Sequence, residues 1–208
     1  MTDDTASWIA DWQPEDTALQ AARQRAAEVG VGAVDPATGA VLRLLASANG
    51  AGTAVELGTG AGVSTLWLLR GLLPDGVLTS VDSDGEHQRL AKASLADADV
   101  PSGRVRLISG RALEVLPRLS ESSYDLVFCD AAKSENLDYL TAALTLLRPG
   151  GLVVFAGALS NGRITQSGAR DAETVAMREL AKAVVAQDRL LPAMIPVGAG
   201  LLAATLVD

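Results

Sequence analysis

Short apolar runs alternate along the chain with stretches in which apolar residues recur every three or four positions. The runs at 53–57, 77–81 and 124–129 are typical of buried strands, and the spacing at 86–96 is typical of a helix. Strands that alternate with helices in this way form a parallel sheet with helices on both faces. The sequence therefore predicts an α/β fold with a doubly wound, mostly parallel sheet.

The pattern predicts seven strands and a helical arm ahead of them. The predicted strands are 53–57, 77–81, 105–108, 124–129, 152–155, 191–197 and 201–207. The predicted helices are 14–29 in the arm, one that begins at Asp35-Pro36 and stops at Asn49-Gly50, and then 63–73, 86–96, 137–147 and 172–184. We expect residues 1–33 to form the arm and residues 34–208 to form a single domain.

The uncharged stretch at 190–207 is long enough for a membrane span. Pro192, Pro196, Gly198 and Gly200 divide it, so a β-hairpin of two short strands joined by a glycine turn is the better interpretation. We therefore expect no membrane contact.

Composition narrows the classes of function. The 208 residues carry a net charge of −8, which disfavours a nucleic-acid partner because phosphate contacts require clustered Lys and Arg. With 49% apolar residues, the chain is not expected to be disordered. One cysteine, Cys129, and one histidine, His87, exclude a disulfide framework and the usual zinc ligand sets. Because the N-terminus is acidic and lacks an apolar run, we expect a cytoplasmic protein.

Three glycines at alternate positions follow the first predicted strand. Residues 56–62 read Glu-Leu-Gly-Thr-Gly-Ala-Gly between a strand and a helix, where a ligand can approach the backbone closely. A dinucleotide site would require a glycine where this chain has Val63, which disfavours a nicotinamide-dependent oxidoreductase. Asp82 ends the next strand, where its carboxylate either accepts ribose hydroxyl protons or caps a helix. The pattern predicts a cofactor site.

From Val34 onward, the chain resembles the small S-adenosylmethionine-dependent O-methyltransferases that include the catechol and caffeoyl-CoA enzymes. Residues 56–62 resemble motif I of class I methyltransferases, and segments 114–117 and 125–133 are more specific to this family. The resemblance implies a Rossmann-like seven-stranded sheet with an antiparallel last strand. It also implies S-adenosylmethionine as cofactor, methyl transfer to a hydroxyl of a small molecule, and a homodimer.

The resemblance further implies which residues bind the cofactor. They are Val34, Glu56, Gly58, Thr59, Gly60, Ser64, Asp82, Ala112 and Asp130. Ala112 would lie beside the adenine. The family usually has an acidic residue before this alanine, whereas this chain has Arg111, whose guanidinium can stack on the ring instead.

Two positions depart from the metal site that the resemblance implies. The family holds a divalent ion with an aspartate that corresponds to Asp130 and with an Asp-Asn pair, which is replaced here by Ala156 and Gly157. A lone carboxylate is expected to hold Mg²⁺ only weakly. We therefore predict no metal ligands and methyl transfer without a tightly bound divalent metal.

Lys133 matches the catalytic lysine of the family. A phenol with a pKa of about 10 must lose its proton near pH 7, so Lys133 is predicted to act as a base, with Asp130 facing the sulfonium or the substrate. A lysine solvated at the start of a helix is the alternative interpretation. No catalytic role is expected for His87, on the first turn of a helix, and Cys129 is expected to be buried.

A second hypothesis comes from another class of protein. Arg111, Ala156 and Gly157 are consistent with a protein that keeps the fold, the dimer and the cofactor but has lost catalysis. The sequence names no methyl acceptor. Residues 1–33 and 159–169 are expected to shape the acceptor pocket or the dimer contact.

Overall fold

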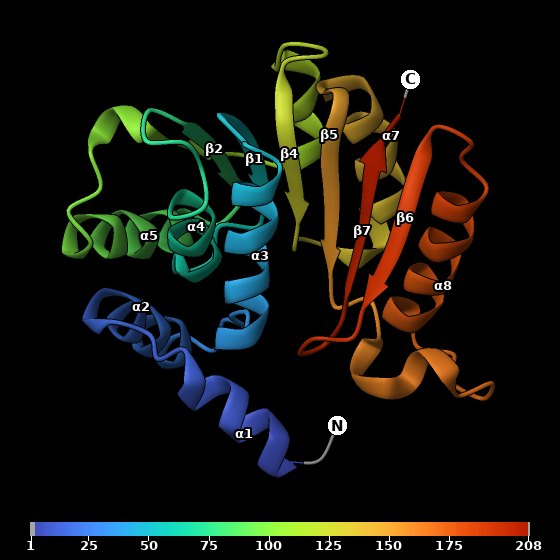
Figure 1. Cartoon of the computed structure of the whole chain (residues 1–208), viewed down its shortest axis with the longest axis horizontal. Helices are drawn as coiled ribbons and strands as arrows, with labels where there is room; N and C mark the ends of the chain where they lie inside the picture. The colour runs from blue at the N-terminus through green and yellow to red at the C-terminus, as the bar shows by residue number, and fades with distance from the viewer. Residues whose placement is uncertain (1–2, 208) are drawn as a thin grey trace.

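A seven-stranded sheet forms the centre of the computed structural model, which describes residues 3–207 (Figure 1). Its strands are β1 (Thr53–Leu57), β2 (Val77–Asp82), β3 (Val105–Ser109), β4 (Tyr124–Cys129), β5 (Leu147–Ala156), β6 (Leu190–Ile195) and β7 (Leu201–Leu206). The strand order is β3-β2-β1-β4-β5-β7-β6. Pairs from β3 to β5 are parallel, and β7 is antiparallel to both of its neighbours. The predicted fold class is confirmed, including the antiparallel last strand and the closing hairpin.

Helices cover both faces of this sheet. They are α1 (Asp3–Trp12), α2 (Thr17–Glu28), α3 (Pro36–Ala48), α4 (Val63–Leu69), α5 (Gly85–Asp97), α6 (Ala112–Val115), α7 (Asn136–Leu146) and α8 (Ala172–Val185). Short 3₁₀ turns are η1 (Ser102–Arg104), η2 (Leu116–Arg118), η3 (Lys133–Glu135) and η4 (Ser160–Thr165). Apolar residues of α2, α3, α4 and α5 pack on one face, and those of α6, α7 and α8 on the other. Among the described residues, no helix is both long and apolar enough to cross a membrane.

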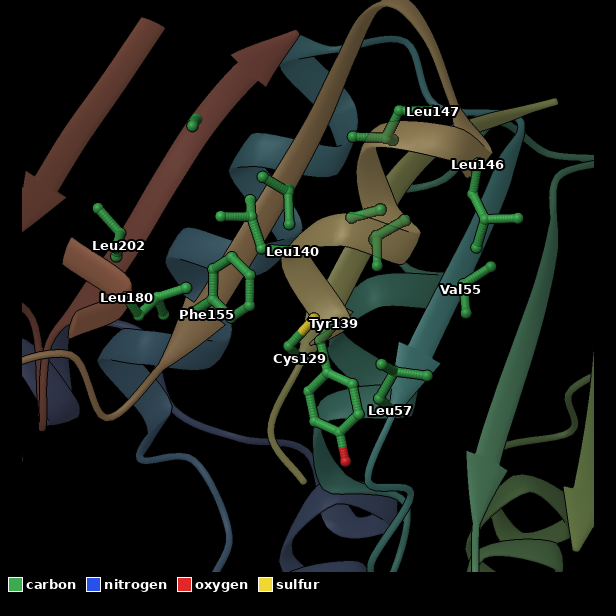
Figure 2. Close-up of a cluster of buried hydrophobic side chains, with 14 of the residues drawn as sticks. Val55, Leu57, Cys129, Tyr139, Leu140, Leu146, Leu147, Phe155, Leu180 and Leu202 are labelled. Carbon is green, nitrogen blue, oxygen red and sulfur yellow. The ribbon is translucent and has the colours of Figure 1, made fainter. Parts of the chain in front are cut away.

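The central strands are apolar on both faces because both faces are covered. Val55 and Leu57 of β1 point toward α7, where they join Cys129, Tyr139 and Phe155 in one cluster (Figure 2). The Cys129 side chain is buried, as predicted, and this burial raises the pKa of its thiol. The cysteine is therefore part of the core.

Helix starts follow the predicted capping signals. The Asp35 carboxylate accepts the N–H of Thr38 at 3.0 Å, and Pro36 occupies the first turn of α3. Ends are less well predicted, since α4 stops at Leu69 instead of continuing to residue 73. Gly71 passes so close to the carbonyl of Arg43 that a side chain there would collide with it.

The N-terminal arm has two helices, where the sequence predicted one at 14–29. In α2, Leu19 and Ala22 are buried against the core. The preceding α1 extends away from the body of the molecule (Figure 1) and leaves Trp8 and Trp12 63% and 70% exposed. Only α2 is therefore part of the packed domain, and α1 is an appendage beside it.

Candidate active site

A cavity of about 950 Å³ opens at the carboxyl ends of the parallel strands. After β1 the chain moves outward through β2 and β3 and then returns to the other side of β1 as β4, so the crevice between β1 and β4 is the place where this topology binds ligands. Predicted site residues that line the cavity are Val34, Gly58, Thr59, Gly60, Ser64, Asp82, Ala112, Asp130 and Lys133. The fold thus brings together side chains from four strand ends.

The glycine turn after β1 brings the backbone against β4. Gly58 has φ +94°, and a Cβ atom there would lie 2.5 Å from the carbonyl oxygen of Asp130. Gly62, with φ +89°, begins α4 in a left-handed conformation. Both positions require glycine, because other residues rarely adopt such backbone angles. The turn leaves backbone rather than side chains facing the cavity.

Asp82 lies at the end of β2 with its carboxylate fixed by three groups. Its oxygens accept the backbone N–H groups of Gly60 and Asp84, each at 2.9 Å. The Nδ1 atom of His87 lies 3.2 Å from both carboxylate oxygens. Asp82 is therefore both an anchor of the glycine turn and an acceptor at the cavity wall, and it does not cap α5, a role taken by Asp84.

Glu56 lies behind the cavity wall and does not line the cavity. Its side chain is fully buried, and its carboxylate accepts hydrogen bonds from the hydroxyls of Ser64, Thr65 and Ser80, each at 2.6 Å. Burial raises the pKa of Glu56 to about 7, although the three hydroxyls oppose this increase. Glu56 joins β1, β2 and α4 beneath the glycine turn.

The opposite end of the cavity contains a salt bridge. The Nζ atom of Lys133 lies 2.8 Å from Oδ1 of Asp130, and the two side chains are 17% and 30% exposed. Ala156 and Gly157 form the adjacent wall at the end of β5 and add no side-chain oxygen. Within residues 3–207, no three His, Cys, Asp or Glu side chains are grouped as metal ligands. The residues present do not fit a divalent metal, which needs several oxygen ligands.

Residues 15–207 match the family model described as O-methyltransferase. The chain belongs to the O-methyltransferase family. A protein of Mycobacterium tuberculosis named as a probable O-methyltransferase is 52% identical over 190 residues, which cover 91% of this chain and 85% of the relative.

Solved structures of O-methyltransferases have the same fold. The enzyme TomG of Streptomyces achromogenes, solved with S-adenosylmethionine, is 30% identical with a TM-score of 0.90 and full coverage of both chains. An O-methyltransferase of Bacillus cereus, solved with S-adenosylhomocysteine, is 27% identical with a TM-score of 0.89, covering 98% of this chain and 97% of the other. Both matches span nearly the full length of this chain.

Arg111 stands where the resemblance implies an acidic residue, and its side chain turns toward solvent. It is 66% exposed and bonds to Oε1 of Glu135 at 3.1 Å. The other oxygen of Glu135 accepts the hydroxyl of Tyr139 at 2.5 Å. Arg111 therefore lines the rim of the cavity through a surface ion pair and does not block the interior.

Sequence reasoning missed several residues of the cavity wall. His87, Asn161 and Glu173 line it, as does Ile9 of α1. Residues of both segments, 1–33 and 159–169, thus line the cavity. His87 follows Asp82 by five residues, and only the turn at residues 83–84, which brings the start of α5 back over β2, places its ring on the carboxylate.

Proposed function

We propose that this protein transfers a methyl group from S-adenosylmethionine to a hydroxyl of a small molecule and does so without a tightly bound divalent metal. The observation that carries this proposal is the carboxylate of Asp82, held beside a glycine turn at the reversal of strand order. Relatives in the same family, solved with S-adenosylmethionine or S-adenosylhomocysteine, support the identity of the cofactor.

The β1–β2 side of the cavity suits an adenosyl group. Asp82 would accept hydrogen bonds from the ribose hydroxyls, because Gly60, Asp84 and His87 do not use all the lone pairs of its two oxygens. Ala112 leaves room for a flat ring beside it. Val34, Gly58, Thr59, Gly60, Ser64 and Asp130 complete the wall around the remainder of the cofactor, and Glu56 supports this wall from behind. When bound, the cofactor supplies an electrophilic methyl group on a sulfonium.

The β4–β5 side must hold the acceptor oxygen in line with that methyl group. Correct alignment of two reactants can contribute about 7–11 kcal/mol to lowering the barrier. Charged side chains near Gly157 are Lys133, Asp130, Glu173 and Arg163, and we assign the salt-bridged pair of Lys133 and Asp130 to the acceptor hydroxyl. The chain must also exclude water from this end of the cavity and stabilise negative charge on the acceptor oxygen.

A methyl-transfer assay tests the proposal. The protein is incubated with S-adenosylmethionine carrying a labelled methyl group and a panel of simple phenols, catechols and phenolic acids, in EDTA and separately in Mg²⁺. We expect labelled methyl ethers at equal rates in both buffers. A protein that binds S-adenosylhomocysteine but labels no acceptor supports the non-catalytic hypothesis instead.

We further propose a cytoplasmic homodimer. The arm predicted at residues 1–33 is reduced in this proposal to α1, because α2 packs on the domain predicted at residues 34–208. Support comes from the exposed apolar side chains of the arm and of the β6 edge, where Leu191 and Met194 are 64% and 42% exposed. Sedimentation at micromolar concentration is expected to give twice the mass of the chain. A monomer would contradict the proposal.

A further inference from the structure

Lys133 is a partly buried cation at the cavity end between β4 and β5. Lys133 begins η3 and directs its ammonium back to Asp130, 2.8 Å away. A Cβ atom built on Gly157 would lie 3.4 Å from Cε and 3.7 Å from Nζ of Lys133. The ammonium thus lies within van der Waals contact of the Cβ position at residue 157.

This arrangement leaves the ammonium with donors for a ligand. An ammonium has three N–H groups, and within the described residues the hydrogen bond recorded for Lys133 is the one to Asp130. Ala156 and Gly157 offer no acceptor side chain. An oxygen atom that enters this end of the cavity therefore meets ammonium N–H groups that Asp130 does not use, and the carboxylate of Glu173 is the other acidic group that lines this end with Lys133 and Gly157.

We propose that Lys133 acts here as a fixed cation that binds the acceptor as an oxyanion, and that the preferred acceptor is an acidic phenol with one hydroxyl. This inference rests on the proposed function and replaces the predicted role of Lys133 as a base. A base at this position would have to be a neutral amine, and its hydrogen bond to the Asp130 carboxylate would then no longer be an ion pair. As a cation, it keeps that bond and attracts negative charge.

The proton and the charges balance without a base in the protein. The phenol releases its proton to water, and the phenolate binds to the ammonium. The lone pair of the phenolate oxygen then forms the O–C bond as the C–S bond of the sulfonium breaks, and the pair of that bond stays on sulfur. The negative oxygen and the positive sulfur both become neutral.

The same geometry explains the acceptor class. A divalent metal can chelate two neighbouring oxygens, whereas an ammonium donates single hydrogen bonds and has no coordination sphere to complete. A second hydroxyl next to the first is therefore not required. The acidity of the phenol matters instead, because it sets the fraction of phenolate near neutral pH.

The test uses full-length protein with S-adenosylhomocysteine and 4-nitrophenol, whose phenolate is coloured and whose neutral form is not. Lys133→Arg keeps a cation that cannot act as a base, and Lys133→Met removes the charge at similar length. We expect the wild type and Lys133→Arg to bind the phenolate and to lower the apparent pKa of the bound probe by about one unit. Lys133→Met is expected to lose this shift.

Turnover of 4-nitrophenol with S-adenosylmethionine gives the second measurement. We expect Lys133→Arg to stay within about 10-fold of the wild-type rate and Lys133→Met to fall by about 100-fold or more. Lys182 forms a salt bridge of the same spacing with Glu179 at 2.8 Å, outside the cavity. Lys182→Met is therefore the matched control, and we expect it to leave both measurements unchanged.

Three results would overturn the inference: no binding of nitrophenolate by the wild type, equal losses in Lys133→Arg and Lys133→Met, or turnover of catechol but not of single-hydroxyl phenols. Calorimetric titration of the same samples with S-adenosylhomocysteine separates these results from failure of the proposed function. A protein that does not bind S-adenosylhomocysteine at all contradicts the proposed function itself.

Discussion

The two ends of the cavity are built differently. The β1–β2 end is made of backbone in restricted conformations, with Gly58 against the Asp130 carbonyl and Gly60 bonded to Asp82. The β4–β5 end is made of small residues and one salt bridge, with a wall from the η4 loop, where Ser160 and Asn161 have φ of 48° and 52°. The first end tolerates few substitutions, whereas the second can change its ligand through a few side chains.

The largest loss of stability is expected from a substitution at Gly58, where an added side-chain methyl group would collide with the backbone of Asp130. Gly58→Ala places a Cβ atom 2.5 Å from the Asp130 oxygen at a φ of +94°, which we expect to lower the free energy of unfolding by about 3–5 kcal/mol. Binding of S-adenosylhomocysteine should be lost with it. Urea unfolding and calorimetry measure the two effects. Gly85→Ala is the control, because no atom lies within 4 Å of its Cβ position, and a comparable loss there would refute the argument.

The next largest effect is a pH dependence of stability caused by Glu56, the buried carboxylate behind the β1–β2 end of the cavity. Glu56 has a pKa near 4.5 when unfolded and about 7 when folded, so the folded state binds more protons between these values. The stabilisation is complete below pH 4.5 and is lost as the pH rises through 7, with a total of about 3 kcal/mol. Glu56→Gln cannot ionise and should be more stable than the wild type at pH 8 but not at pH 5. Urea unfolding at both pH values checks this, and parallel curves for the two proteins would contradict it.

A smaller effect, a loss of affinity for S-adenosylhomocysteine, is expected from a substitution of Asp82, whose carboxylate faces the cavity. Asp82→Asn removes the negative charge, and a hydrogen bond to a charged group contributes about 1.5–3 kcal/mol. The Kd for S-adenosylhomocysteine should therefore rise by about 10- to 100-fold. Asp84→Asn, which retains the cap of α5, should change the Kd by less than about 3-fold. Equal effects in the two variants would exclude Asp82 as the ribose acceptor.

The smallest effect on cofactor affinity is expected from a substitution of Arg111 at the rim of the cavity. Arg111 is 66% exposed, and exposed ion pairs such as that with Glu135 contribute about 0–1 kcal/mol. Arg111→Ala should therefore change the Kd for S-adenosylhomocysteine by less than about 5-fold, measured by calorimetry. A loss of 100-fold would show that Arg111 contacts the adenine.

Local sequence signals predicted the fold well and the site in part. The strand at 124–129 and the start of α3 at Asp35-Pro36 agree with the structure, because both depend on neighbouring residues alone. The arm was less predictable, since α1 packs little of its surface on the domain. The membrane-length stretch at 190–207 became a hairpin, as its prolines and glycines indicated.

Contacts between distant segments limited the prediction of the site. The predicted strands placed Asp82 and Asp130 at strand ends, and the family resemblance singled out Lys133. Neither could show that three hydroxyls from α4 and β2 enclose Glu56. Nor could they show that the ring of His87 bonds to Asp82 or that Lys133 lies beside Gly157. These contacts depend on how the helices pack against the sheet, which the local sequence pattern does not specify.

Calorimetric titration with S-adenosylhomocysteine, in Mg²⁺ and again in EDTA, tests the central claim most directly. The account holds that the β1–β2 end is a complete cofactor site and that a salt bridge replaces the metal at the other end. It predicts micromolar binding with the same Kd in both buffers. Binding that requires Mg²⁺, or no binding in either buffer, would contradict it.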